Sequence, residues 1–159
     1  MTAPKLQQGI LVVVDDPGWR RFRGLLPRVK RAAAAAGKAA KFSSHSSFTV
    51  LLASDRKLKS LNRDFRGKDK ATNVLSFPAA ANSERYLGDV ALALGVTRRE
   101  AKAAGKSVAD HAAHLVAHGV LHLAGYDHVR DRDAKVMEAL EVEILGRLGI
   151  ANPYGAAAP

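Results

Sequence analysis

Cysteine is missing from this sequence of 159 residues, so disulfide bonds, thiolate catalysis and sulfur-ligated metal sites are excluded. Long apolar runs are missing too, because no stretch approaches the ~20 residues that a membrane-spanning helix needs. The first residues, Met1–Gln8, lack the apolar core of a signal peptide. We therefore expect a cytoplasmic protein with no membrane association and no disulfide partner.

Acidic residues are few, since 15 Asp and Glu stand against 25 Lys and Arg and leave a formal net charge of +10. Such an excess favours a polyanionic partner, most simply nucleic acid, although a basic charge can also serve solubility alone. The length suits one core and one domain. We predict a single catalytic domain over residues 1–150 and a disordered tail over residues 151–159, which is rich in small residues.

Hydrophobic patterning predicts an α+β fold, in which about five helices pack on a small, mostly parallel sheet of four strands. Short β-branched or apolar runs mark the strands, and apolar positions at helical spacing mark the helices. The strands are expected at Ile10–Val14, Phe48–Ala53, Thr72–Phe77 and Leu87–Leu94. The helices are expected at Trp19–Ala40 in two pieces, Ser54–Phe65, Thr97–Ala104, Ser107–Gly125 and Asp131–Leu148.

The most informative motif is the run H-G-V-L-H-L-A-G-Y-D-H, which contains His118, His122 and His128. Positions 118 and 122 are one helical turn apart, so both imidazoles project from one face of a helix. Gly125 can end that helix, and the following turn can bring His128 back toward the other two rings. Three imidazoles without a fourth protein ligand are typical of an open, catalytic zinc site. We predict one Zn²⁺ per chain, although imidazole sites also accept nickel, copper and iron.

Three further histidines exceed the number of ligands that such a site needs. His111 and His114 lie on the same helix, whose two faces both look buried. They are either ordinary core histidines or groups that line or support the metal site, and His114 is our candidate for a partner of a ligand. His45 lies in a polar stretch and is expected in an ordinary loop.

The spacing H-x-x-x-H-x-x-G-x-x-H is that of the metzincin zinc peptidases. Those enzymes carry a glutamate directly after the first histidine, where it serves as the general base. Here that position is Gly119, which has no proton-accepting group, and Met137 falls in a helical pattern rather than in a Met-turn. The motif therefore predicts metzincin-like metal geometry without the peptidase chemistry.

A second segment, Leu61–Pro78, gathers four basic side chains at a helix end and in the following loop. They are Arg63, Arg66, Lys68 and Lys70. An arginine fork suits bidentate recognition of phosphate and can neutralise charge that develops in phosphoryl transfer. The alternative is a solvated basic loop whose charges complement the helix dipole.

The two segments together resemble the YbeY family of bacterial rRNA maturation factors. The resemblance rests on R-G-K-D-K-A-T-N-V-L-S-F-P, L-G-D-V and the histidine run, and extends from about Leu51 to Leu148. It implies a zinc-dependent endoribonuclease, specific for single strands, that acts in 16S rRNA 3′-end processing and ribosome quality control. Single-stranded rRNA and the small ribosomal subunit are the implied partners. Ala71 stands where the family often has proline, which removes no functional group.

The resemblance also implies the roles of particular residues. The zinc ligands become His118, His122 and His128, and the catalytic arginine becomes Arg66, which would stabilise negative charge in the transition state.

Other roles stay open at this point. Arg63, Lys68 and Lys70 are expected to hold neighbouring phosphates without sequence preference. Asp127 is either a general base or partner of a ligand histidine, or a turn residue that bonds its own backbone. Attack by water and attack by the substrate 2′-hydroxyl are both compatible with these residues. Two other functions compete with the nuclease: an RNA-binding module of the ribosome with a structural zinc, and a non-nuclease metallohydrolase.

Overall fold

Four strands form one sheet in the order β1-β2-β4-β3, in a computed structural model that describes residues 9–127 and 129–154. The strands are β1 (Ile10–Val14), β2 (Ser47–Ala53), β3 (Val74–Pro78) and β4 (Tyr86–Ala93). β1 and β4 pair with β2 in parallel, whereas β3 pairs with β4 antiparallel. The predicted α+β class with four strands is confirmed. The sheet is mixed because a loop, residues 79–85, joins β3 directly to β4 and so reverses the chain.

Five α-helices and the short 3₁₀ helix η2 (Pro17–Arg21) complete the described fold, which confirms the expected number of helices. The helices are α1 (Leu25–Ala39), α2 (Asp55–Arg66), α3 (Leu94–Ala104), α4 (Val108–Leu123) and α5 (Asp131–Arg147). The helix predicted from Trp19 to Ala40 is in two pieces, as expected, and Pro27 lies in the first turn of the second piece. Serine side chains cap the starts of two helices, with Ser54 before α2 and Ser107 before α4.

α3 begins at Leu94 rather than at the predicted Thr97. A carboxylate from α2 explains the earlier start, because Asp55 accepts a hydrogen bond of 3.0 Å from the backbone N–H of Val96. The first N–H groups of a helix have no partner within the helix. This distant acceptor supplies one, so the additional turn forms although its own sequence carries no capping side chain.

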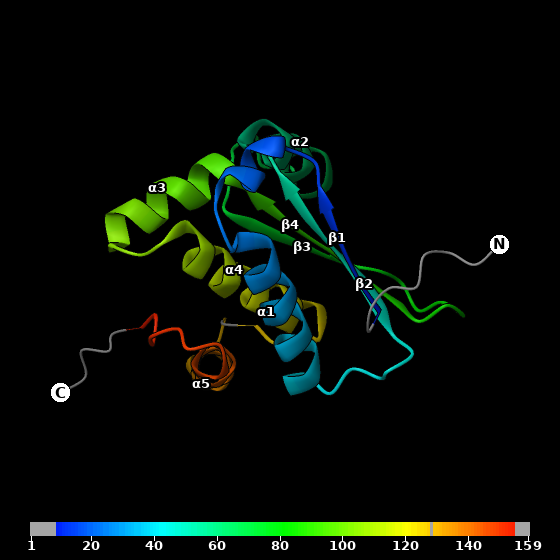
Figure 1. Ribbon diagram of the computed structural model, residues 1–159. Coiled ribbons are helices and arrows are strands. Elements are labelled where there is room, and N and C mark those ends of the chain that lie inside the picture. Colours follow the sequence, from blue (N-terminus) through cyan, green and yellow to red (C-terminus); the bar gives the residue numbers. More distant parts are fainter. Residues whose placement is uncertain (1–8, 128, 155–159) are drawn as a thin grey trace.

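Helices cover the two faces of the sheet unequally. α1 and α4 pack on one face, α5 lies against them on the outside, and α2 packs on the other face (Figure 1). The larger core lies between the sheet and α1 and α4, where Val50, Leu92 and Val120 are fully buried. The core under α2 is smaller and centres on Leu58 and Leu75. α4, which carries the histidines, is thus buried on most of its surface, as predicted.

α4 approaches the sheet closely at Gly119. A Cβ atom at this position would lie only 2.4 Å from Cγ1 of Val90 in β4 and 3.2 Å from Cγ2 of Val74 in β3. The hydroxyl of Ser76 donates a hydrogen bond of 2.8 Å to the carbonyl oxygen of Gly119 at the same contact. Glycine is therefore required here for packing, and the site of the metzincin glutamate is occupied by the sheet.

None of the helices within the described ranges is long and apolar enough to cross a membrane. Residues 151–154, the start of the segment predicted to be disordered, form a turn that packs back on α5, where the hydroxyl of Tyr154 bonds to Glu141. The boundary at residue 150 stays a prediction. Residues 155–159 lie outside the described residues, and the single domain stays a prediction.

We predict that Gly119→Ala destabilises the protein by about 1–2 kcal/mol, because Val90 is fully buried and overpacking a core of valine side chains forces them to shift. Gly146→Ala in α5 is the matched control, since no atom outside its own helix lies within 4 Å of the added Cβ. It should be neutral or stabilise by up to about 1 kcal/mol through helix propensity. Urea unfolding measures both, and equal stabilities of the two variants would contradict the close packing of α4.

Candidate active site

His118 and His122 project from the same face of α4 and converge. Their Nε2 atoms are 3.1 Å apart, and the ring centroids are separated by 4.6 Å. The helix ends just beyond them, where Gly125 adopts a φ of +97°. There the backbone N–H of Tyr126 donates a hydrogen bond of 3.1 Å to the carbonyl oxygen of Leu121. The predicted helix end at a glycine turn is confirmed. His128, the third predicted ligand, lies outside the described residues.

A buried carboxylate stands behind the histidines. Glu141 of α5 is only 1% exposed, and it accepts hydrogen bonds from Nδ1 of His118 at 3.0 Å and from Nε2 of His114 at 2.7 Å. The hydroxyl of Tyr154 donates to the same carboxylate. Burial alone would raise the pKa of Glu141, but the three hydrogen bonds outweigh it and lower this pKa to about 2. Glu141 is therefore an anion that fixes two imidazole rings.

The hydrogen bond to Glu141 sets the tautomer of His118. A carboxylate only accepts, so Nδ1 of His118 carries the proton and Nε2 carries the lone pair. The two Nε2 atoms lie 3.1 Å apart, close enough for both to bind one cation in place of the hydrogen bond between them. A carboxylate bonded to the far nitrogen of a ligand histidine is also the usual second partner in protein zinc sites. The donor set thus fits a metal ion held at the two Nε2 atoms.

Arg66 lines the same pocket as the two histidines. Its guanidinium donates a hydrogen bond of 2.8 Å to the carbonyl oxygen of Ser76 and lies 5.8 Å from the centre of the Phe77 ring. The pocket has a volume of about 450 Å³. Its lining consists of Arg66, Thr72, Asn73, Val74, Ser76, Pro78, His118 and His122. Two segments that were identified separately in the sequence, the histidine run and the basic segment, therefore meet across β3.

The other basic residues of the segment lie outside the lining of this pocket. Arg63 bonds to Asp64 and Ser60 on the surface of α2. Lys68 and Lys70 are exposed on the loop after Gly67, which folds back on α2 because the buried Asn62 donates to the carbonyl of Lys70 at 2.9 Å. These three residues stay predicted contacts for phosphates at a distance from the pocket.

Asp127 is exposed, and its carboxylate accepts a hydrogen bond of 3.1 Å from the backbone N–H of Val129. This is the turn contact that the sequence left open as the alternative to a catalytic role. Its predicted part in catalysis stays a prediction.

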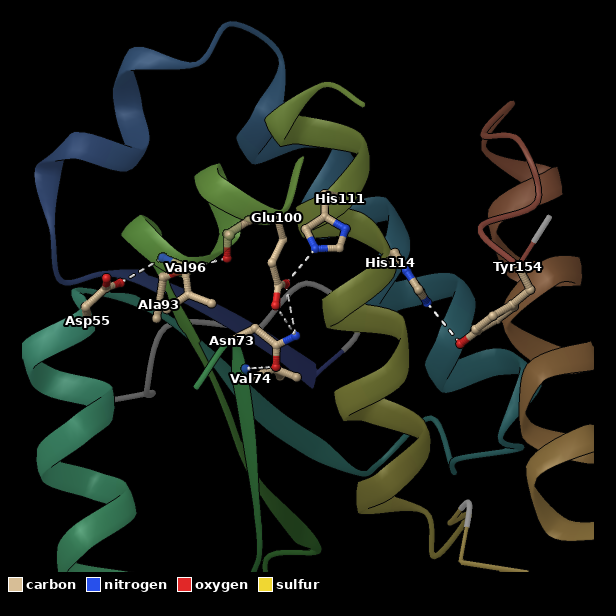
Figure 2. A network of polar contacts seen from close by, with 10 residues as sticks. Asp55, Asn73, Val74, Ala93, Val96, Glu100, His111, His114 and Tyr154 are labelled. Carbon is tan, nitrogen blue, oxygen red and sulfur yellow. Dashed lines mark hydrogen bonds and ion pairs between the residues drawn. The ribbon is translucent and has the colours of Figure 1, made fainter. Parts of the chain in front are cut away.

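His111 and His114 lie one turn apart on α4, with ring centroids 6.0 Å apart, and they bond to carboxylates of different helices (Figure 2). His111 bonds to Glu100 of α3 at 2.9 Å, and Glu100 accepts a hydrogen bond of 3.0 Å from the side chain of Asn73. Asn73 lines the pocket, so these hydrogen bonds connect His111 to the pocket wall. Burial lowers the pKa of His111 despite the neighbouring Glu100. His114 and His118 bond to the same carboxylate, that of Glu141, which links His114 to the site. His45 is exposed in its loop.

Sequence reasoning missed Glu141. A signal was present, because Glu141 follows the core residue Met137 by four positions and precedes Ile144 by three, which places a carboxylate on the buried face of α5. Val136 of the same helix, although apolar, is 48% exposed. A charge at a core position needs buried partners, and the surplus histidine His114 is one of them.

Comparisons with known proteins show the family of this chain. The family model described as endoribonuclease YbeY matches residues 23–149. The chain is 46% identical to the endoribonuclease YbeY of Maricaulis maris, over 90% of this chain and 89% of that protein. It is 53% identical to the one of Sphingopyxis alaskensis, over 66% and 69% respectively. The solution structure of TM1509 from Thermotoga maritima shares the fold, with a TM-score of 0.58 and 22% identity over 92% of this chain and 99% of that one.

The protein is an α+β protein with a mixed sheet. Its pocket contains two histidines from α4 and one arginine from α2, which meet at the edge strand β3. This chain belongs to the YbeY endoribonuclease family, which the sequence motifs predicted.

We predict that Glu141→Gln lowers the affinity for zinc by about 10- to 100-fold, because an amide does not replace a charged acceptor that orients a ligand imidazole. Glu143→Gln on the exposed face of the same helix is the control, since Glu143 pairs only with Arg147 among its described contacts. Competition with a chromophoric chelator measures the affinity, and urea unfolding shows separately whether the fold is kept. Equal zinc affinities of the two variants would contradict the role assigned to Glu141.

Proposed function

We propose that this chain is a metal-dependent endoribonuclease that cleaves single-stranded RNA in the maturation of the 3′ end of 16S rRNA and in ribosome quality control. The observation that carries the proposal is the shared pocket of Arg66, His118 and His122. The names of the similar proteins support the endoribonuclease activity. The net charge of +10 suits a polyanionic substrate of this kind. The small ribosomal subunit is the proposed partner, and the cytoplasm the proposed location.

In this proposal His118, His122 and His128 hold one zinc ion. When bound, zinc lowers the pKa of a coordinated water and polarises a phosphoryl oxygen. Glu141 keeps the imidazole of His118 in the tautomer that presents Nε2 to the pocket. Its negative charge, buried directly behind the rings, also favours a cation in front of them.

Arg66 supplies the positive charge on the other side of the pocket. One of its N–H groups is held by the carbonyl of Ser76, which fixes the guanidinium plane before substrate arrives. The remaining N–H groups can bind the non-bridging oxygens of a phosphodiester and stabilise the additional negative charge of the transition state. A donor that is oriented in advance requires no rearrangement when the charge develops.

The packing at Gly119 argues against the peptidase alternative. The position of the peptidase glutamate faces Val90 and Val74 at less than 3.5 Å, so it offers neither a carboxylate nor space for one. A ribosome-bound RNA-binding module with a structural zinc differs from the proposal in one measurable property, namely RNA cleavage.

We predict that the purified protein cleaves single-stranded RNA, including a 16S precursor with an extended 3′ end, and leaves a duplex of the same sequence intact. Removal of the metal with a chelator should abolish cleavage, and added zinc should restore it. The assay follows end-labelled RNA, with metal content measured in each sample. Cleavage that persists after proven metal removal would refute metal dependence, and RNA binding without cleavage would favour the binding-module alternative.

We also predict that Arg66→Ala lowers the single-turnover cleavage rate by about a hundredfold or more at equal metal content, the usual cost of losing an oriented transition-state donor. Stability should change by less than about 0.5 kcal/mol, since Arg66 is exposed. Arg66→Lys should restore the rate only in part, because an ammonium lacks the planar fork. Arg56→Ala removes the same charge from the other end of α2 and is the control. Equal rates for the two alanine variants would remove Arg66 from the mechanism.

A further inference from the structure

A second, larger groove lies on the other side of β3, on the face of the sheet that α2 covers. Its volume is about 790 Å³, within the range of sites that bind small organic groups. We call it the α2 groove. It is lined mainly by Thr49, Leu51, Leu61, Phe65, Phe77 and Asp89. Arg66, Ser76 and Pro78 line both this groove and the histidine pocket, so the two cavities adjoin at these residues.

Two aromatic rings form one wall of the α2 groove. Phe65 and Phe77 pack edge to face, with ring centroids 5.5 Å apart and an angle of 61° between the planes. Phe65 is nevertheless 69% exposed, more than any other phenylalanine in the described part of the chain. An exposed aromatic ring beside a cationic helix end is a surface on which nucleobases stack, because every base offers a π-face.

Arg66 connects this wall to the proposed catalytic pocket. Its guanidinium lies 5.8 Å from the centre of the Phe77 ring, while its N–H groups reach Ser76 at the edge of β3. A phosphate bound to Arg66 on the histidine side therefore has an aromatic surface next to it on the α2 side. Adjacent base and phosphate groups are the repeating unit of a single nucleic-acid strand.

The α2 groove also has an acidic side chain, because Asp89 of β4 pairs with Phe77 across the two strands and lines the same groove. The hydroxyl of Tyr86 bonds to Thr49 at 2.7 Å and also to Asp89. Burial and the bond to Asp89 raise the pKa of Tyr86 to about 12, so this hydroxyl stays a donor to the carboxylate. A carboxylate repels phosphate but accepts hydrogen bonds from the amino groups of bases. The lining therefore suits a nucleobase and not the sugar-phosphate backbone.

We propose that the α2 groove binds one nucleobase of the single-stranded RNA, from a nucleotide that flanks the phosphate at Arg66, with Phe65 and Phe77 as the stacking surface. This inference rests on the proposed function and extends it, because it assigns part of the preference for single strands to the groove. A base within a duplex is stacked and paired, so its faces are not available to an aromatic wall. A protein partner in the same groove would require neither the arginine contact nor the adjoining pocket.

The test is an abasic scan of RNA binding. A short single-stranded RNA with a 2′-deoxy linkage at its centre is titrated against the metal-loaded protein, and each position in turn lacks its base. For the wild type, we expect one position at which loss of the base weakens binding by about 5- to 100-fold. In Phe65→Ala this abasic penalty should fall below about twofold, and in Phe65→Tyr, which keeps a ring, it should return. Val136→Ala, an exposed apolar residue of α5, is the control.

Each alternative outcome is distinct. An abasic penalty of equal size in wild type and Phe65→Ala, or no position-dependent penalty at all, overturns the base site while leaving RNA binding and cleavage intact. Unchanged RNA affinity of Phe65→Ala in every oligonucleotide overturns it in the same way and leaves the groove to a protein partner. Absence of RNA binding by the wild type overturns both this inference and the proposed function. Urea unfolding of Phe65→Ala excludes a general loss of structure.

Discussion

Ser76 joins the two halves of the proposed active site through two hydrogen bonds. Its hydroxyl donates to the carbonyl of Gly119 on the histidine helix, and its own carbonyl accepts from the guanidinium of Arg66, both at 2.8 Å. The first bond fixes α4 against β3, and the second fixes the arginine beside the same strand. The bond between Ser76 and Gly119 is buried, so it competes little with water. The position of the cationic side chain relative to the imidazoles therefore depends on one residue of an edge strand.

Charged and polar groups of opposite kinds alternate across the proposed active site. The anionic Glu141 lies behind His118, the imidazole Nε2 atoms lie in the middle, and the guanidinium of Arg66 closes the pocket. A buried carboxylate is costly unless it is fully hydrogen-bonded, and Glu141 meets that condition with two histidines and a tyrosine. The tyrosine, Tyr154, comes from the turn after α5, so a segment outside the regular elements helps to hold the site.

Sequence patterns predicted those features of the fold that depend on residues close together in the chain. Helix boundaries with local caps, such as Ser107 before α4 and Gly125 after it, followed from side-chain chemistry and backbone freedom. Features that depend on distant residues did not follow, such as the early start of α3, which needs Asp55 from another helix. The role of Glu141 was not predicted, because its histidine partners lie 23 and 27 residues away in the sequence.

We expect His118 and His122 to hold, at their Nε2 atoms, the metal ion that RNA cleavage requires. X-ray diffraction from zinc-loaded crystals, recorded on both sides of the zinc absorption edge, tests it most directly. We expect one anomalous peak per chain, within bonding distance of both Nε2 atoms and in the pocket that Arg66 lines. A peak that contacts neither histidine, or zinc bound only at the molecular surface, would contradict it.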